Sequence, residues 1–311
     1  MKVAIMFSGQ GSQYPGMMQD LFENYPCAME SFELAKQVYG RDIYDICMNG
    51  TQEKLDETEN TQPCLLVCEF AALRVLKELG IPYDAAMGFS LGEWTALSAV
   101  GAADEAEILK IVELRAAAMQ RAVPLGQGGM ASILGKDNEF VAQFCKEIGD
   151  VEPAIYNCAG NISVAGKSDA IDRFLQRAEA EEIMASRVAI SIPSHCWLME
   201  PAVEELTPLI NALELRRSHT AFVMNASGQE TGEPEQIKAN LIRQLSKPVL
   251  FGQSVETLLE QDYDTFIEVG PGKVLSGLVK RAARQMKKKV TICSFNSCES
   301  VQAVKELFAK D

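Results

Sequence analysis

The sequence predicts a mixed α/β protein in which a parallel sheet carries an inserted small subdomain. Strand-like and helix-like segments alternate from the first residues onwards, an order that favours a parallel sheet with helices on its faces. The alternation breaks at the glycine-rich residues 124–129, and shorter units follow in the order β-α-β-β-α-β, which is the split-βαβ pattern. Beyond about residue 191 the longer alternation returns. We therefore expect a large subdomain at 1–122 and 192–311 and a small one at 123–191.

Each unit can be placed from its hydrophobic period and its flanking residues. In the first part we expect strands at 3–7 and 85–89 and helices at about 28–38, 62–79, 93–98 and 104–121. The helix at 62–79 should begin behind Thr61, with Pro63 in its first turn. The inserted segment should hold strands at 130–134, 153–157, 162–165 and 187–190, with helices at 137–148 and 168–180. The last part should hold helices at 199–213, 234–245, 273–285 and 299–309, with strands at 221–224, 265–269 and 290–293.

Composition excludes several classes of function. The net charge of −14 argues against general binding to nucleic acid or to membranes. No apolar run approaches the length needed to span a bilayer, and residues 1–7 resemble a first buried strand rather than a signal peptide. The nine cysteines form no C-x-x-C pair, so we expect free thiols, no metal site and a cytoplasmic protein.

The most informative motif is G-x-S-x-G at 88–92, which stands between a predicted strand and a predicted helix. Glycines flanking a sharp strand-to-helix turn leave room for crowded backbone atoms, so Ser90 should be exposed at the tip. A helix N-terminus also favours developing negative charge. The sequence thus indicates a serine nucleophile, with a serine N-cap in an ordinary turn as the alternative.

A serine nucleophile needs a base, and the chain has two histidines. His219 lies in a polar approach to a strand and is expected to be solvated. His195 follows a strand end that breaks at Pro193, where α/β sheets gather catalytic groups, and is the better partner for Ser90. The glycines at 9–11 and the segment at 270–273 lack the remaining residues of nucleotide-binding loops, so no nucleotide cofactor is expected.

With these residues in place, the chain resembles the acyltransferase family of fatty-acid and polyketide synthesis, whose members include malonyl-CoA:acyl-carrier-protein transacylases. The segments that carry the resemblance are F-S-G-Q-G-S-Q at 7–13, G-F-S-L-G-E at 88–93, L-R-A-A-A-M-Q at 114–120, I-P-S-H-C at 192–196, R-Q-L-S-K-P-V at 243–249 and E-V-G-P-G-K-V-L at 268–275. They occur in family order over almost the whole chain. The resemblance implies an α/β-hydrolase-like large subdomain and a ferredoxin-like small one.

The resemblance also implies roles for individual residues. Ser90 would attack the thioester and carry the acyl group, with His195 as general base and then acid. The backbone N–H groups of Gln10 and Leu91 would stabilise the tetrahedral oxyanion. In place of the carboxylate of a hydrolase triad, the backbone carbonyl of Gln244 would orient the imidazole.

Arg115 is implied to bind the free carboxylate of a malonyl group, because its planar fork matches a carboxylate. Without the resemblance, we would expect an ion pair with Glu113 or with a neighbouring helix. Two positions depart from the family: Phe89 replaces the usual histidine before the nucleophile, and Ala116 replaces the usual glycine after the arginine. Phe89 makes the pocket wall more apolar and bears on acyl selectivity.

Asn157 and Asn161 are candidates for the small-subdomain wall of the pocket, with bonding to loop backbone as the alternative. The densest basic stretch of the chain predicts a docking face for an acidic carrier protein, with a solvated helix face as the alternative. Four of its residues, Lys280, Arg281, Arg284 and Lys287, are the docking candidates.

The sequence therefore predicts an enzyme that moves malonyl from malonyl-CoA to the phosphopantetheine thiol of acyl carrier protein. The reaction would be of ping-pong type, with coenzyme A released, and would use no permanently bound cofactor. We expect a monomer that serves fatty-acid synthesis. The alternatives are a free-standing acyltransferase or thioester hydrolase of a polyketide assembly line with another acyl group, and a non-catalytic carrier-binding scaffold.

Overall fold

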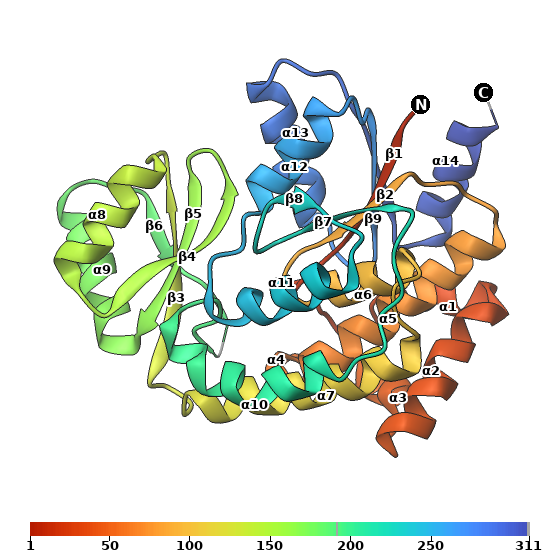
Figure 1. Ribbon diagram of the computed structural model, residues 1–311, viewed down its shortest axis with the longest axis horizontal. Coiled ribbons are helices and arrows are strands. Elements are labelled where there is room, and N and C mark those ends of the chain that lie inside the picture. Colours follow the sequence, from red (N-terminus) through yellow and green to blue (C-terminus); the bar gives the residue numbers. More distant parts are fainter. Residues whose placement is uncertain (191, 310–311) are drawn as a thin grey trace.

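The computed structural model describes residues 1–190 and 192–309. It contains two sheets, one in each part of a bilobed molecule (Figure 1). Residue 191, the predicted end of the small subdomain, and residues 310–311, the predicted end of the large one, lie outside the described residues. Within the described ranges, no helix is both long and apolar enough to cross a membrane.

The large sheet has six strands in the order β10-β9-β1-β2-β7-β8, parallel except for the short edge strand β8. Its strands are β1 (Val3–Phe7), β2 (Ala85–Gly88), β7 (Ala221–Met224), β8 (Gln229–Glu230), β9 (Thr265–Val269) and β10 (Thr291–Phe295). β1 is central and pairs in parallel with β2 and with β9. Its five residues are all buried, as expected for a parallel strand covered on both faces.

Helices cover both faces of this sheet (Figure 1). On one face Ile5 and Phe7 of β1 join a core formed mainly by α2, α5, α6, α7, α10 and α11, whereas Ala4 and Met6 face α12 and α13 on the other. The helices of this part are α1 (Gln19–Asn24), α2 (Pro26–Tyr39), α3 (Ile43–Asn49), α4 (Gln52–Asp56), α5 (Thr58–Glu78), α6 (Gly92–Ala99), α7 (Glu105–Ala122), α10 (Glu200–Asn211), α11 (Pro234–Ser246), α12 (Phe251–Glu260), α13 (Val274–Gln285) and α14 (Cys298–Phe308).

The small sheet is antiparallel and has the order β4-β5-β3-β6. Its elements are β3 (Gly128–Leu134), α8 (Asn138–Ile148), β4 (Val151–Cys158), β5 (Asn161–Lys167), α9 (Ser168–Ala180) and β6 (Ala185–Arg187). One face packs against α8 and α9 around Phe144 and Phe174, and Figure 1 shows these helices on the outer side. This order is that of a ferredoxin-like fold, so the predicted fold class is confirmed.

The edge strand β4 of the small sheet pairs with residue 249, which lies between α11 and α12 of the large part. The N–H of Tyr156 donates to the carbonyl of Val249 at 2.9 Å, and the N–H of Val249 donates to that of Ala154 at 2.9 Å. A side chain on Gly252 would place its Cβ 3.0 Å from the α-carbon of Cys158, so glycine lets α12 approach β4 closely. The same glycine weakens the helical pattern of 251–260, and the sequence analysis missed this helix.

Several predicted boundaries were wrong. α5 begins at Thr58, behind Glu57, and not behind Thr61. Pro63 is tolerated inside the helix because the carbonyl of Glu59, which would have bonded the missing N–H, accepts from Arg41 Nη2 at 3.1 Å. β6 lies at 185–187, earlier than the predicted strand at 187–190. The short elements α1, α3, α4 and β8 were not predicted, because they are too short to show a hydrophobic period.

Candidate active site

Ser90 lies in the turn between β2 and α6 and has a left-handed backbone conformation, with φ of +54°. The turn is crowded on both sides of the serine. A Cβ on Gly88 would lie 2.0 Å from the carbonyl carbon of Gly92, and one on Gly92 would lie 2.2 Å from the carbonyl oxygen of Phe7. The two glycines of the motif are therefore a steric requirement of this turn, and they place the loop after β1 against the first turn of α6.

That loop carries Gln10. Its side-chain Nε2 donates to Thr58 Oγ1 at 2.9 Å, which anchors the loop to the first turn of α5. In the described part of the chain, the backbone N–H groups of Gln10 and Leu91 donate to no protein acceptor. Backbone N–H groups without protein partners are suited to an oxyanion, and Leu91 directly follows Ser90.

His195 also has a left-handed backbone, with φ of +62°, and its side chain is buried. Its Nε2 lies 2.7 Å from Ser90 Oγ, and its Nδ1 lies 2.6 Å from the backbone carbonyl oxygen of Gln244. Because a carbonyl can only accept, Nδ1 carries the proton, and Nε2 is left to accept the proton of the serine hydroxyl. Burial lowers the pKa of His195 to about 4, although the hydrogen bond to the Gln244 carbonyl acts in the opposite direction and raises it. The imidazole is therefore a neutral base at pH 7.

Gln244 contributes its side chain as well as its carbonyl. Its Nε2 donates to the backbone carbonyl of Ser90 at 2.9 Å and to Glu93 Oε2 at 2.6 Å. Its Oε1 accepts from Arg115 Nη2 at 3.3 Å. One buried glutamine thus contacts the nucleophile's backbone, the base and the arginine.

Arg115 projects from α7 and is 1% exposed. Its Nη1 donates to Gln62 Oε1, and its Nη2 lies 3.5 Å from Ser90 Oγ. Glu113 is not its partner, because that carboxylate lies 3.7 Å from Arg41. Among the described residues, no carboxylate lies within ion-pair distance of Arg115, and its buried Nε has no acceptor. Burial lowers the pKa of Arg115 to about 10, so the guanidinium remains charged at pH 7. The arrangement is that of an anion site beside the nucleophile.

The structure adds three polar residues that the sequence analysis missed. Gln62 lies on α5, at the position where that helix was predicted to begin, and Glu93 and Asn225 are fully buried. Burial raises the pKa of the Glu93 carboxyl to about 8, while the Asn225 N–H, the Arg115 charge and the Gln244 amide lower it. In the sequence, the only signal that could have identified these three residues was the position of each next to a predicted strand or motif.

Among the described residues, the remaining pocket candidates form no hydrogen bond with the side chains of Ser90, His195 or Arg115. Phe89 packs edge-on against Phe251, with ring centroids 5.2 Å apart. Asn157 Nδ2 donates to Asn161 Oδ1 at 3.2 Å and to Ser163 Oγ at 3.1 Å, all within the β4–β5 hairpin. These bonds connect side chains rather than loop backbone, and the pocket role of the two asparagines stays a prediction. His219 is exposed, as expected.

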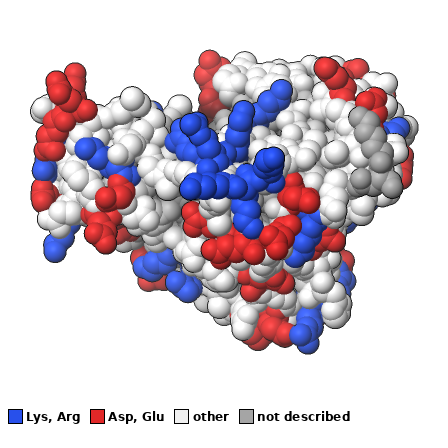
Figure 2. Space-filling model, turned by 90° about the horizontal axis from the view of Figure 1, so that it is seen from above, with Lys and Arg blue, Asp and Glu red and all other residues white. Residues whose placement is uncertain are grey.

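The four docking candidates are exposed on and just after α13. Figure 2 views the molecule from above, the side on which α13 lies in Figure 1, and shows a group of basic side chains on this face. Arg281 and Arg284 also line a hollow of about 560 Å³ beside the β4–β5 turn. The N-terminus of α13 is fixed by Glu268, whose carboxylate accepts from the N–H groups of Leu275 and Ser276 at 3.1 and 2.8 Å.

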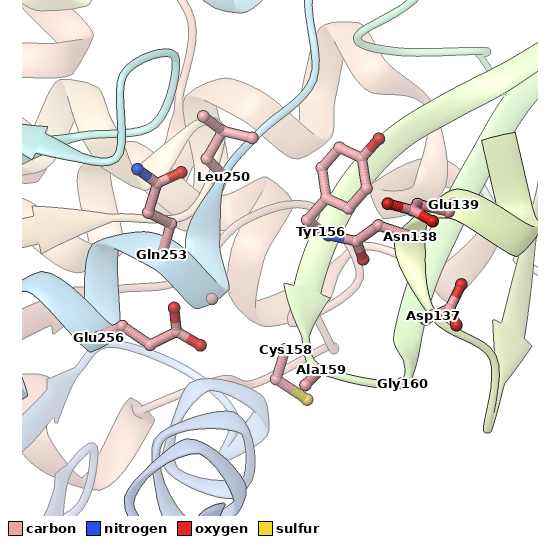
Figure 3. A pocket seen from close by; sticks show the side chains of 11 residues that line it. Asp137, Asn138, Glu139, Tyr156, Cys158, Ala159, Gly160, Leu250, Gln253 and Glu256 are labelled. Carbon is pink, nitrogen blue, oxygen red and sulfur yellow. The ribbon is translucent and has the colours of Figure 1, made fainter. Parts of the chain in front are cut away.

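A larger hollow of about 670 Å³ opens where α8 and β4 meet α12, and neither Ser90 nor His195 lines it. Figure 3 shows that three carboxylates, those of Asp137, Glu139 and Glu256, project around it. Negative charge makes this hollow unsuitable for a phosphate-bearing substrate.

Comparison with known proteins places these features in context. The acyl transferase domain family matches residues 5–304. The malonyl CoA-acyl carrier protein transacylase of Staphylococcus aureus strain MW2 is 39% identical over 98% of this chain and 99% of its own. That of Haemophilus influenzae is 37% identical over 98% of each. A malonyl-transacylase solved in complex with a type II polyketide synthase acyl-carrier protein has a TM-score of 0.94 at 35% identity, and the match covers 99% of this chain and 100% of that one. The Coxiella burnetii transacylase has a TM-score of 0.94 at 34% identity, over 99% and 98%.

Proposed function

Because the chain belongs to the acyl transferase domain family, and its relatives over nearly full length are malonyl-CoA–acyl carrier protein transacylases, we propose that it transfers malonyl from coenzyme A to acyl carrier protein. The observation that carries the proposal is the pairing of Ser90 and His195 at 2.7 Å beside a buried arginine that has no carboxylate within ion-pair distance among the described residues. The malonyl units would supply chain extension in fatty-acid synthesis, with a polyketide pathway as the alternative.

In the first half-reaction, neutral His195 takes the proton of Ser90 through Nε2 while the serine oxygen attacks the thioester carbonyl. Negative charge on the carbonyl oxygen is stabilised by the N–H groups of Gln10 and Leu91. The tetrahedral adduct then collapses, the carbon–sulfur bond breaks, and the coenzyme A sulfur leaves with the proton held by His195. The product is a malonyl ester of Ser90 and free coenzyme A.

The second half-reaction reverses these steps with a new thiol. His195 deprotonates the phosphopantetheine thiol of the carrier protein, and the thiolate attacks the ester carbonyl. Collapse of the second adduct returns the proton from His195 to Ser90 and releases the malonyl thioester. The Gln244 carbonyl supports both halves, because it stabilises the imidazolium that forms in each.

Substrate choice would rest on Arg115. Its charge is buried, and its nitrogen Nη2 lies 3.5 Å from the attacking oxygen, a position from which it can reach the far end of a three-carbon acyl group. A carboxylate bound there would supply the counter-charge that none of the described residues places within ion-pair distance. An acetyl group supplies none.

The carrier protein would dock on the basic residues of α13. Its acidic surface and the overall charge of −14 on this chain repel each other, so a local basic face is needed for encounter. Lys280, Arg281, Arg284 and Lys287 are exposed and form this face. They are the four residues that we assign to docking.

The chain would act in the cytoplasm as a monomer, and we propose the division into 1–122 with 192–311 and 123–191. The free state of all nine cysteines supports the compartment. The small sheet supports the division, because all four of its strands fall within 123–191.

Intact-mass analysis after incubation with malonyl-, methylmalonyl- and acetyl-CoA tests the proposal. We expect a malonyl adduct on the wild type that persists until carrier protein is added and then moves to it. Ser90→Ala should give no adduct, while its far-UV circular dichroism should match the wild type. Free malonate formed without carrier protein would identify a thioester hydrolase. A scaffold would show no adduct with any donor, and this result would overturn the proposed function.

A further inference from the structure

We infer that Asn225 is a positioning residue that holds the nucleophile turn in its active shape, an inference that rests on the proposed function for the identity of the reaction. Asn225 directly follows β7 and is fully buried. β7 pairs with β2 up to the partners Met87 and Val223, so the end of β7 lies beside the turn that contains Ser90. The side chain of Asn225 continues this pairing where the backbone ladder stops.

The contacts of Asn225 match the needs of the turn. Its Oδ1 accepts from the backbone N–H of Ser90 at 2.7 Å, and its Nδ2 donates to the backbone carbonyl of Gly88 at 2.7 Å. The amide therefore bridges the residues on either side of Phe89 and closes the turn from below. An amide offers an acceptor and a donor at these two places at any pH, whereas an ionised carboxylate can only accept.

Asn225 is itself held in place through both its backbone and its side chain. The backbone N–H of Asn225 donates to Glu93 Oε1 at 2.6 Å, and its carbonyl accepts from the N–H of Leu250 at 2.8 Å. Gln244 Nε2 lies 3.4 Å from Asn225 Oδ1. The clamp on Ser90 is thus fixed to α6, to the start of α12 and to the residue whose carbonyl orients His195.

This clamp matters because a serine with φ of +54° is in a conformation that non-glycine residues rarely adopt. Without the two bonds, the turn would relax, and Ser90 Oγ would leave the 2.7 Å contact with His195 Nε2. A displacement of about 1 Å in a reacting group can reduce a rate by about 10²-fold. Arg115 does not contact Asn225, so acyl selectivity should remain.

The decisive experiment compares wild type, Asn225→Ala and the control Asn240→Ala, in which the lost amide bonds only a carbonyl on its own helix. The readouts are the rate of Ser90 modification by an alkyl phosphonofluoridate, which needs no acyl donor, and kcat and KM for malonyl-CoA. We expect Asn225→Ala to lower the modification rate and kcat about 10²-fold, with KM and the malonyl-to-acetyl preference unchanged. A folded Asn225→Ala that reacts as fast as the wild type would overturn the inference.

A second variant decides the question if Asn225→Ala does not fold. In Asn225→Asp only the protonated carboxyl can both donate to Gly88 and accept from Ser90. The modification rate relative to wild type should therefore rise as the pH falls, while the pH dependence of His195 cancels in the ratio. The titratable groups nearest this site are the carboxyl of Glu93 and, through Gln244, the guanidinium of Arg115. A ratio that does not change with pH would refute the clamp. Wild-type protein that reacts with the phosphonofluoridate but not with malonyl-CoA would refute only the proposed function.

Discussion

Replacing Arg115 with alanine should change which acyl group the enzyme prefers. The guanidinium is 1% exposed, its Nη2 lies 3.5 Å from Ser90 Oγ, and the described residues place no carboxylate within ion-pair distance of it. A malonyl carboxylate bound at this position would gain charged hydrogen bonds that acetyl cannot form. In Arg115→Ala the same carboxylate would be buried without a counter-charge.

The size of the effect follows from these contacts. A hydrogen bond to a charged group contributes about 1.5–3 kcal/mol, and about 1.4 kcal/mol corresponds to a tenfold change in rate. We therefore expect kcat/KM for malonyl-CoA to fall by about one to two decades. The substitution also deprives the Oε1 atoms of Gln62 and Gln244 of their donor, but that loss affects both substrates. The ratio of malonyl to acetyl kcat/KM isolates the carboxylate.

The assay measures this ratio in wild type, Arg115→Ala, Arg115→Lys and the control Arg121→Ala. Arg121 lies on the same helix but is exposed and pairs with Glu205, so its loss should leave the ratio unchanged. Lysine should restore the ratio only in part, because an ammonium cannot present two parallel N–H groups. If Arg115→Ala keeps the wild-type ratio, the arginine is structural and selectivity is determined elsewhere, with Phe89 the next residue to test.

Three further predictions concern the base, the arginine's neighbour and the carrier protein. Because burial lowers the pKa of His195 to about 4, the acid limb of kcat/KM for acylation should lie well below pH 6.5, and a limb at 6.5 would contradict this assignment. Because the pKa of His195 is lower in the folded protein than in the unfolded chain, the stability that neutral His195 contributes is complete above about pH 6.5 and is lost as the pH falls towards 4. Urea unfolding of wild type and His195→Ala at pH 7 and at pH 5 measures this loss. Gln62→Leu leaves Arg115 Nη1 without its acceptor, and the cost of about 1–3 kcal/mol should appear as a lower melting temperature and an altered malonyl-to-acetyl ratio; no change in either would exclude this role. Charge reversal by Lys280→Glu and Arg281→Glu should raise KM for carrier protein and make this KM less dependent on salt, while loading of the enzyme from malonyl-CoA should not change. If neither charge reversal nor salt changes the kinetics with carrier protein, these residues form only a solvated helix face.

The sequence by itself determined the fold class and the type of chemistry. Strands and helices show their own hydrophobic periods, and the G-x-S-x-G motif can be recognised locally. Gly88 avoids a clash within the motif itself, whereas Gly92 avoids one with the carbonyl of Phe7 on β1. Long elements such as α7 and β9 were placed closely. Boundaries failed where distant residues supply the missing bonds, as at Pro63, whose helix continues because Arg41 donates to the free carbonyl of Glu59.

The active centre was decided only by the tertiary structure. Ser90 and His195 are hydrogen-bonded but lie 105 residues apart in sequence, and His195 and its partner Gln244 lie 49 residues apart. No local sequence pattern encodes such contacts. Asn225 contacts Ser90 across 135 residues because β7 is the sheet neighbour of β2. Strand order is a property of the assembled sheet. Likewise, the sequence shows an arginine on α7, but only its burial, with no described carboxylate within ion-pair distance, makes Arg115 a candidate anion site, because the energy of a buried charge depends on what surrounds it.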